Sequence, residues 1–134
     1  MKVFRSYGLI FGFLGIILVS AQALGSPLPK PSSSNPEAQK LIDQAWALEK
    51  VDSNAKIYKQ CIDLIEQANK LDPNNPEILI DVSRYYWSYG DSLPKATKEQ
   101  QKALEGIYAK GMAEAEKAMA IKETTGAHYW FAVN

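Results

Sequence analysis

Few side chains in this sequence could do chemistry, and they lie far apart. There is one histidine, His128, and one cysteine, Cys61. His128 has no cysteine or spaced carboxylates of the kind that complete a metal site, and a catalytic base needs a second positioned group. The sequence also lacks a glycine-rich phosphate loop, a nucleophile elbow and paired acids. We therefore expect no enzyme activity, no metal and no cofactor.

The isolated groups have positions typical of packing residues. Cys61 lies on an apolar helical stripe where two helices should cross, so we expect a small buried side chain rather than a nucleophile. His128 should lie near a helix start, with its ring packed against the preceding helix. Six carboxylates stand beside lysines on polar faces and are interpreted as solvated surface: Asp43, Asp63, Glu66, Asp81, Glu114 and Glu116.

Aromatic residues offer the better candidates for a binding surface, because tyrosine and tryptophan bury area and keep a polar group. Trp46, Tyr85, Tyr86 and Tyr129 could equally fill gaps between helices. Trp87 and Tyr89 fall off the apolar stripe and favour an exposed or groove-lining role. Arg84 could add a charge for an anionic ligand. The candidate binding residues are Arg84, Trp87, Tyr89, Tyr129 and Trp130.

A repeated sequence pattern predicts the helices that carry these candidate residues. The phrase Asn-Pro-Glu begins at Asn35 and again at Asn75, and each copy predicts a helix start. The two helices, about 36–49 and 76–89, are the A helices, and the second should stop at Gly90.

A second matching pair lies 50 positions apart and predicts B helices at about 54–71 and 95–122. The second B helix should carry an insertion and start with Pro94 at its first position, after Ser92. Its polar first half should project beyond the packed part or curl over the first helix pair.

The same spacing of 50 places Tyr129 opposite Leu79, so residues from about 126 should begin a third A helix. Tyr129 and Trp130 would then cover the apolar face of the preceding helix. A repeat array needs a polar end cap, and this helix is apolar. We expect that the chain is truncated at Asn134, or that another chain covers this end.

The two-helix unit resembles the tetratricopeptide repeat. Cys61, Ala68 and Pro73 fill its small-residue, alanine and closing-proline positions, whereas the second copy has Gly111, Ala118 and Glu123. The resemblance implies an all-α fold of antiparallel helix hairpins. They would form a short right-handed TPR-like solenoid over residues 36–134, with an incomplete third repeat.

The longer phrase from Asp81 to Asn134, with Tyr-Ala-Lys-Gly leading into His-Tyr-Trp, is more specific. It resembles exported bacterial TPR-like proteins related to the T component of TRAP-type transporters. That resemblance implies an accessory role in solute transport.

The first residues predict export. Residues 1–23 have a basic start, an apolar run and small residues before a cleavage site, which is typical of a signal peptide. An uncleaved membrane anchor is the alternative. Residues 24–35, rich in proline and serine, are interpreted as a flexible or extended linker. We expect a periplasmic or secreted protein that meets the membrane only through its signal segment.

The amino-acid composition limits the kinds of binding partner that we expect. The chain has 15 basic and 15 acidic residues without a basic patch, so nucleic acid is not an expected partner. A single cysteine cannot form an internal disulfide. The favoured hypothesis is a non-catalytic binding or scaffold module that takes a protein or a small-molecule ligand on the aromatic A-helix face. The alternative is a homo-oligomeric assembly subunit with no ligand of its own.

Overall fold

A computed structural model describes residues 28–134. The predicted signal peptide, residues 1–23, and the first part of the predicted linker lie outside the described residues. The described chain is all-α, as predicted, with five helices. These are α1 (Pro36–Val51), α2 (Ala55–Leu71), α3 (Pro76–Asp91), α4 (Lys98–Ile121) and α5 (Thr125–Val133).

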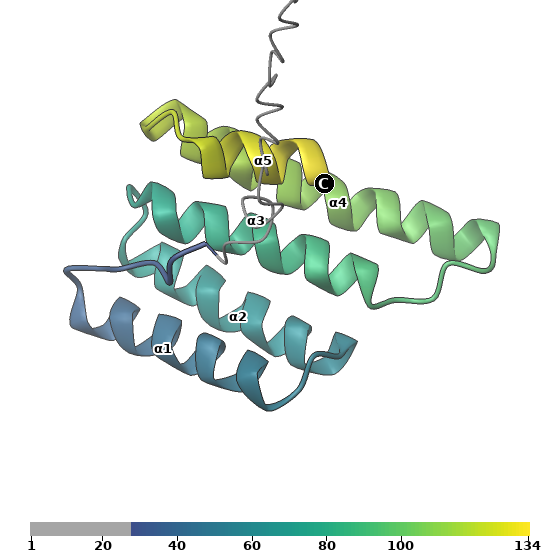
Figure 1. The fold of residues 1–134 in the computed structure, drawn as a ribbon, viewed down its shortest axis with the longest axis horizontal. Helices are drawn as coiled ribbons and strands as arrows, with labels where there is room; N and C mark the ends of the chain where they lie inside the picture. The colour runs from purple at the N-terminus through teal and green to yellow at the C-terminus, as the bar shows by residue number, and fades with distance from the viewer. Residues whose placement is uncertain (1–27) are drawn as a thin grey trace, which may run out of the picture.

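The helices pack in sequence order, each antiparallel to the one before it (Figure 1). Contacts join α1 to α2, α2 to α3, α3 to α4 and α4 to α5, and α5 also touches α3. No helix within residues 28–134 is long and apolar enough to cross a bilayer.

The predicted starts of α1 and α3 are confirmed. Asn35 and Asn75 are the N-caps, and each side-chain oxygen accepts a hydrogen bond from a backbone N–H of the first turn. A proline follows each cap at the first helical position, where its missing N–H costs nothing. The same local chemistry therefore sets both helix starts.

The predicted start of α4 at Pro94 is wrong, because the helix begins at Lys98. Thr97 and Gln100 form a capping box in which each side chain accepts from the other's backbone N–H. Ser92 instead closes the preceding helix, where its hydroxyl donates to the carbonyl of Tyr89 over 2.7 Å. The polar first turns of α4 are exposed as far as Leu104, and this end projects past α3 (Figure 1).

The predicted stop at Gly90 is also wrong, since α3 continues to Asp91. No glycine of the described chain has a positive φ, so Gly90 does not serve as a left-handed C-terminal residue. It is buried, and a Cβ built on it would lie 2.6 Å from Cε1 of Tyr108 in α4. Gly90 lets the Tyr108 ring lie directly on the α3 backbone.

The spacing of 50 fails by one residue in α5. The C-caps Asp72 and Lys122 keep that spacing, but the N-caps Asn75 and Thr124 are 49 positions apart, because the second turn is one residue shorter. One residue turns a helix by about 100°. Ala127 is therefore buried, whereas Tyr129 is 52% exposed and does not cover α4 as predicted.

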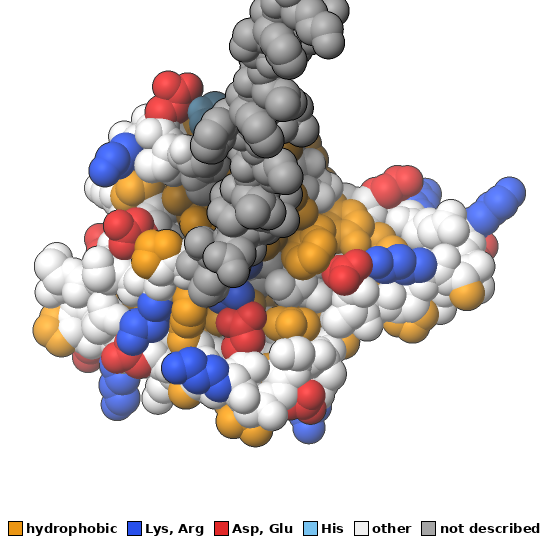
Figure 2. All heavy atoms as spheres, in the orientation of Figure 1, with side chains coloured by type: hydrophobic (Ala, Val, Ile, Leu, Met, Phe, Trp, Pro, Cys, Tyr) orange, Lys and Arg blue, Asp and Glu red, His pale blue; other side chains and the backbone are white. Residues whose placement is uncertain are grey.

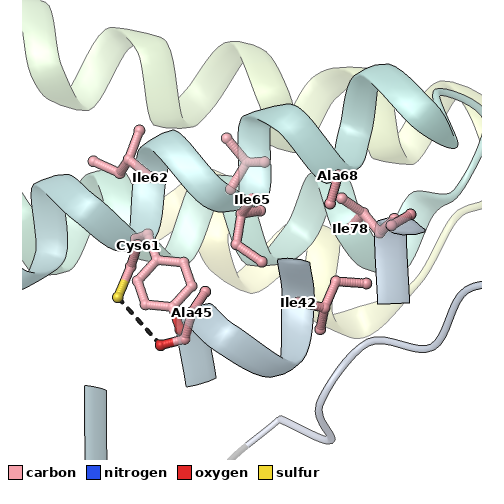
Figure 3. Packing of buried hydrophobic residues seen from close by; sticks show 10 residues of the cluster. Ile42, Ala45, Cys61, Ile62, Ile65, Ala68 and Ile78 are labelled. Atoms are coloured by element: carbon pink, nitrogen blue, oxygen red, sulfur yellow. Dashed lines mark hydrogen bonds between the residues drawn. The ribbon is translucent and has the colours of Figure 1, made fainter. Parts of the chain in front are cut away.

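Two apolar clusters hold the helices together. The first lies between α1, α2 and α3 and includes Ile42, Cys61, Ile65 and Tyr85 (Figure 3). Cys61 is fully buried, as predicted, and its thiol donates to the carbonyl of Ala45 over 3.3 Å. The second cluster joins α3, α4 and α5 and is built from Leu79, Ile80, Ala118 and Ala127, with Leu28, Met119 and Trp130 at its edge.

Residues 28–35, here called the strap, form neither helix nor strand and run from beside α3 to the start of α1 (Figure 1). Pro31 is buried, and Leu28 packs at the edge of the second cluster. The packed part of the described chain therefore begins at Leu28, before the predicted start near Asn35.

Candidate functional site

The candidate residues lie on or near the surface shared by α1, α3 and α5, which we call the A-helix face. On α3, the residues Glu77, Ile80, Arg84 and Trp87 follow one another at intervals of three or four, so they share one side of the helix. Their contacts join this side to α1, to α5 and to the strap. The strap donates to Glu77 and packs against the apolar cluster that contains Ile80, whereas Arg84 and Trp87 meet aromatic residues.

A polar network spans the gap between α1 and α3. Asp81 accepts from Nε1 of Trp46 over 2.8 Å and from Nε of Arg84 over 2.6 Å. The Arg84 guanidinium also donates to both carboxylate oxygens of Glu49, at 2.7 and 3.0 Å. The hydroxyl of Tyr85 donates to the same Glu49 over 3.0 Å. Two carboxylates thus hold one arginine between two helices, and each carboxylate is held in turn by a further donor, Trp46 or Tyr85.

The rings complete the setting of this arginine. The Arg84 guanidinium carbon lies 4.0 Å from the ring centre of Tyr85 and 4.9 Å from that of Trp46. Such stacking of a cation on aromatic faces adds to the ion pairs. The Arg84 side chain is only 12% exposed, so most of this interaction occurs away from water.

Burial and neighbouring charges shift the pKa values of Asp81 and Arg84 in opposite directions. Burial raises the pKa of the Asp81 carboxyl, although the positive charge and hydrogen bond of Arg84 oppose this shift. Burial also acts to lower the pKa of Arg84, but Asp81 and Glu49 outweigh it and hold that pKa above its ordinary value. Arg84 therefore stays charged, and its charge is already matched by carboxylates. A ligand anion would have to compete with Glu49 and Asp81.

The interpretation of Asp81 as a solvated surface carboxylate is wrong. Asp81 is 3% exposed and lies within the apolar run of α3. The sequence signal was its position three residues before Arg84 in that run, which places the two on one helix face. Glu49 was not among the predicted binding residues. Its partner Arg84 is 35 positions away, so no local spacing in the sequence indicates their contact.

The second part of the A-helix face is aromatic. The rings of Trp87 on α3 and Trp130 on α5 are 5.8 Å apart between centres and tilted by 53°. Tyr129 meets Trp130 edge-on, with ring centres 4.9 Å apart. Nε1 of Trp130 is buried and has no hydrogen-bond partner within residues 28–134. An unpaired buried donor is uncommon, and burial keeps this N–H out of reach of a ligand while the Trp130 ring stays in place.

The structure brings together four of the five candidate binding residues. Arg84 and Trp87 are neighbours on α3, and Trp87 leads through Trp130 to Tyr129. Tyr89 is separated from them, because its half-buried ring packs against the first apolar cluster. In Figure 2, hydrophobic side chains gather beside the grey residues, over α3 and the end of α5.

The groups considered for chemistry remain apart. His128 is exposed, and the prediction that its ring packs on α4 is wrong; its Nε2 lies 3.6 Å from Oε1 of Glu123. Burial raises the pKa of the Cys61 thiol to about 11, so it is protonated at neutral pH. Among residues 28–134, no group of three or more His, Cys, Asp or Glu side chains could hold a metal ion.

No family model matches this chain, and no curated protein or solved structure is significantly similar to it.

Proposed function

We propose that this chain is a non-catalytic binding or scaffold module that holds a protein or a small ligand on its A-helix face. The observation that carries the proposal is the partly exposed contact between Trp87 on α3 and Trp130 on α5. Tryptophan pairs of this kind supply large contact area at a small cost in conformational entropy.

The proposal includes a TPR-like solenoid as the architecture. It is supported by the shared Asn-Pro starts of α1 and α3 and by the small residues Cys61 and Gly111 at equivalent positions of α2 and α4. Export to the periplasm or the cell exterior rests on residues 1–23, with an uncleaved anchor as the alternative. A role as a transporter accessory component rests on the resemblance of the segment from Asp81 to Asn134 alone.

Affinity capture from an extract of exported proteins and metabolites tests the binding proposal. Wild-type protein and a Trp87→Ala variant are compared by mass spectrometry, with Lys59→Ala as a control, because the Lys59 side chain is 53% exposed on α2, outside the A-helix face. We expect at least one specifically retained molecule that Trp87→Ala loses and Lys59→Ala keeps. If Trp87→Ala retains everything that the folded wild-type protein retains, the proposal fails.

The second candidate function is a homo-oligomeric assembly subunit. It is favoured by a shallow apolar groove of about 410 Å³ on the outer side of the first hairpin, lined by Gln44, Ala47, Leu48, Val51 and Leu64. An exposed apolar groove of this kind can serve as a protein interface. Light scattering at high concentration tests it, and a chain that stays monomeric, with no change on Val51→Asp, excludes this function.

A further inference from the structure

The strap contacts the A-helix face as a peptide ligand would. The side chain of Leu28 packs against the second apolar cluster, which contains Ile80, and lies near Gly126 at the start of α5, where a Cβ would be 3.4 Å from its Cδ2. Pro31 is buried. Three residues of the strap, Leu28, Lys30 and Asn35, precede a proline, which disfavours a helix and favours an extended backbone at each of them. The apolar contacts of the strap are therefore made by a non-helical peptide.

The residues of the strap that follow Leu28 make polar contacts with α1 and with the start of α3. Lys30 donates to Oδ1 of Asp43 on α1 over 2.7 Å. The backbone N–H and the hydroxyl of Ser32 both donate to Oε2 of Glu77, at 3.2 and 3.3 Å. Nδ2 of Asn75 donates to the carbonyl of Ser32 over 2.8 Å. The receiving surface thus offers carboxylates to a cation and to backbone donors.

The next residue is held in the same way. The hydroxyl of Ser33 donates to Oδ2 of Asp72 over 2.6 Å, and this bond lowers the pKa of the Asp72 carboxyl below its ordinary value. The hydrogen bond from Lys30 has the same effect on the pKa of Asp43. Both carboxyls are therefore ionised at neutral pH, and the one cation of the strap, Lys30, faces an ionised carboxylate of the surface.

Most of these bonds lie near water. The side chains of Lys30 and Asp43 are 45% and 51% exposed, and pairs so exposed contribute little to stability. The helix caps do not depend on residues 28–33, because the side chains of Asn35 and Asn75 accept the first-turn N–H groups of α1 and α3. We therefore expect that residues 28–33 can leave the surface while Asn35 and the five helices stay in place.

We propose that this acidic part of the A-helix face binds extended peptides with an apolar residue, a proline, a lysine, a second proline and two small hydroxyl residues in succession. Residues 28–33 of the chain occupy the surface in cis. The inference rests on the proposed function in using the same face, but it concerns Asp43, Asp72 and Glu77 rather than the tryptophans. A tethered segment competes at an effective concentration of about 1 mM, so an outside peptide must displace it.

The test measures binding of a dye-labelled synthetic peptide with the sequence of residues 26–35 by fluorescence anisotropy. The full chain is compared with a Leu28→Asp/Lys30→Glu variant whose strap fits its surface poorly. We expect the variant to bind the peptide at least tenfold more tightly than wild type, because the internal competitor is weakened. Adding Asp43→Lys to this variant should reduce binding by about fivefold, and a peptide with glutamate in place of lysine should bind the variant about fivefold more weakly.

Circular dichroism establishes that each variant keeps its helices, and Lys59→Glu, on the far polar side of α2, serves as the matched charge control. Absence of peptide binding by the folded strap variant overturns the proposal, as does binding that Asp43→Lys leaves unchanged. A wild-type dimer that the peptide dissociates would also overturn it, by making a second copy the occupant. If peptide binding meets the expectation but Trp87→Ala loses no captured molecule, the proposed function fails and this inference stands.

Discussion

The Arg84 network allows a stability prediction of definite size. Replacing Arg84 by methionine keeps much of the side-chain volume and removes the charge. Asp81, whose side chain is 4% exposed, is then left buried with no cation, and Glu49, at 23% exposure, loses two hydrogen bonds. Breaking a buried ion pair by removing one partner costs about 3–5 kcal/mol. Because Glu49 can still reach water, we expect about 3 kcal/mol, the lower end of that range.

A loss of about 3 kcal/mol is large relative to the total free energy of unfolding of a domain. A domain of this size is stable by roughly 5–15 kcal/mol, so Arg84→Met should move the urea midpoint well below that of wild type. The measurement is urea unfolding followed by circular dichroism at 222 nm. The matched control is Lys59→Met, which removes a cation from an ion pair with Asp63 that is half exposed on both sides. The control should change the free energy of unfolding by less than about 1 kcal/mol.

A second substitution shows the origin of the loss. Adding Asp81→Asn to Arg84→Met removes the buried charge as well, so the double variant should be more stable than Arg84→Met alone. If Arg84→Met costs no more than Lys59→Met, or if Asp81→Asn costs the same with and without Arg84, the network is not a coupled buried unit and our reasoning is refuted.

Three further predictions concern small and sulfur-containing residues. Gly90→Ala should lower the free energy of unfolding by about 1–3 kcal/mol, because its methyl group would overlap the ring of Tyr108. Gly106→Ala should raise the free energy of unfolding by about 0.5–1 kcal/mol, since nothing lies within 4 Å of a Cβ at that site. Equal effects of the two substitutions would contradict this reasoning. Gly111→Ala should loosen α5, since its Cβ would overlap Oδ1 of Asn134, and hydrogen exchange in α5 should rise. Unchanged exchange in α5 would contradict this packing. Cys61 should resist a thiol reagent at pH 8 until the chain unfolds, and rapid labelling of the folded chain would refute its burial. The stability that its buried neutral thiol contributes should be lost as pH rises from 9.0 towards 11, and the Cys61→Ala variant should not show this loss.

Helix positions were predictable because their signals are local. Asn35 and Asn75 cap their helices with their own side chains, and a buried residue such as Ile42 recurs on a period that the sequence displays. The start of α4 was missed because Pro94 is a strong signal, yet the capping box at Thr97 satisfies more backbone groups.

The candidate site was only partly predictable, because its contacts depend on distant parts of the chain. The aromatic types pointed to Trp87 and Trp130, but their contact requires α5 to be rotated by the short turn before Thr124. The strap could not be predicted, since a segment rich in proline and serine has the composition of a linker. Its partners, such as Glu77, come into position only when the helix starts lie side by side.

The end of α5 also has a consequence for how related sequences can vary. The Asn134 amide donates to the hydroxyl and the carbonyl of Ser83 on α3, and its side chain lies over Gly111 on α4. These three residues share one small volume where three helices meet, so a larger side chain at one position requires a smaller one at another. In related chains, substitutions at positions 83, 111 and 134 should therefore occur together rather than independently.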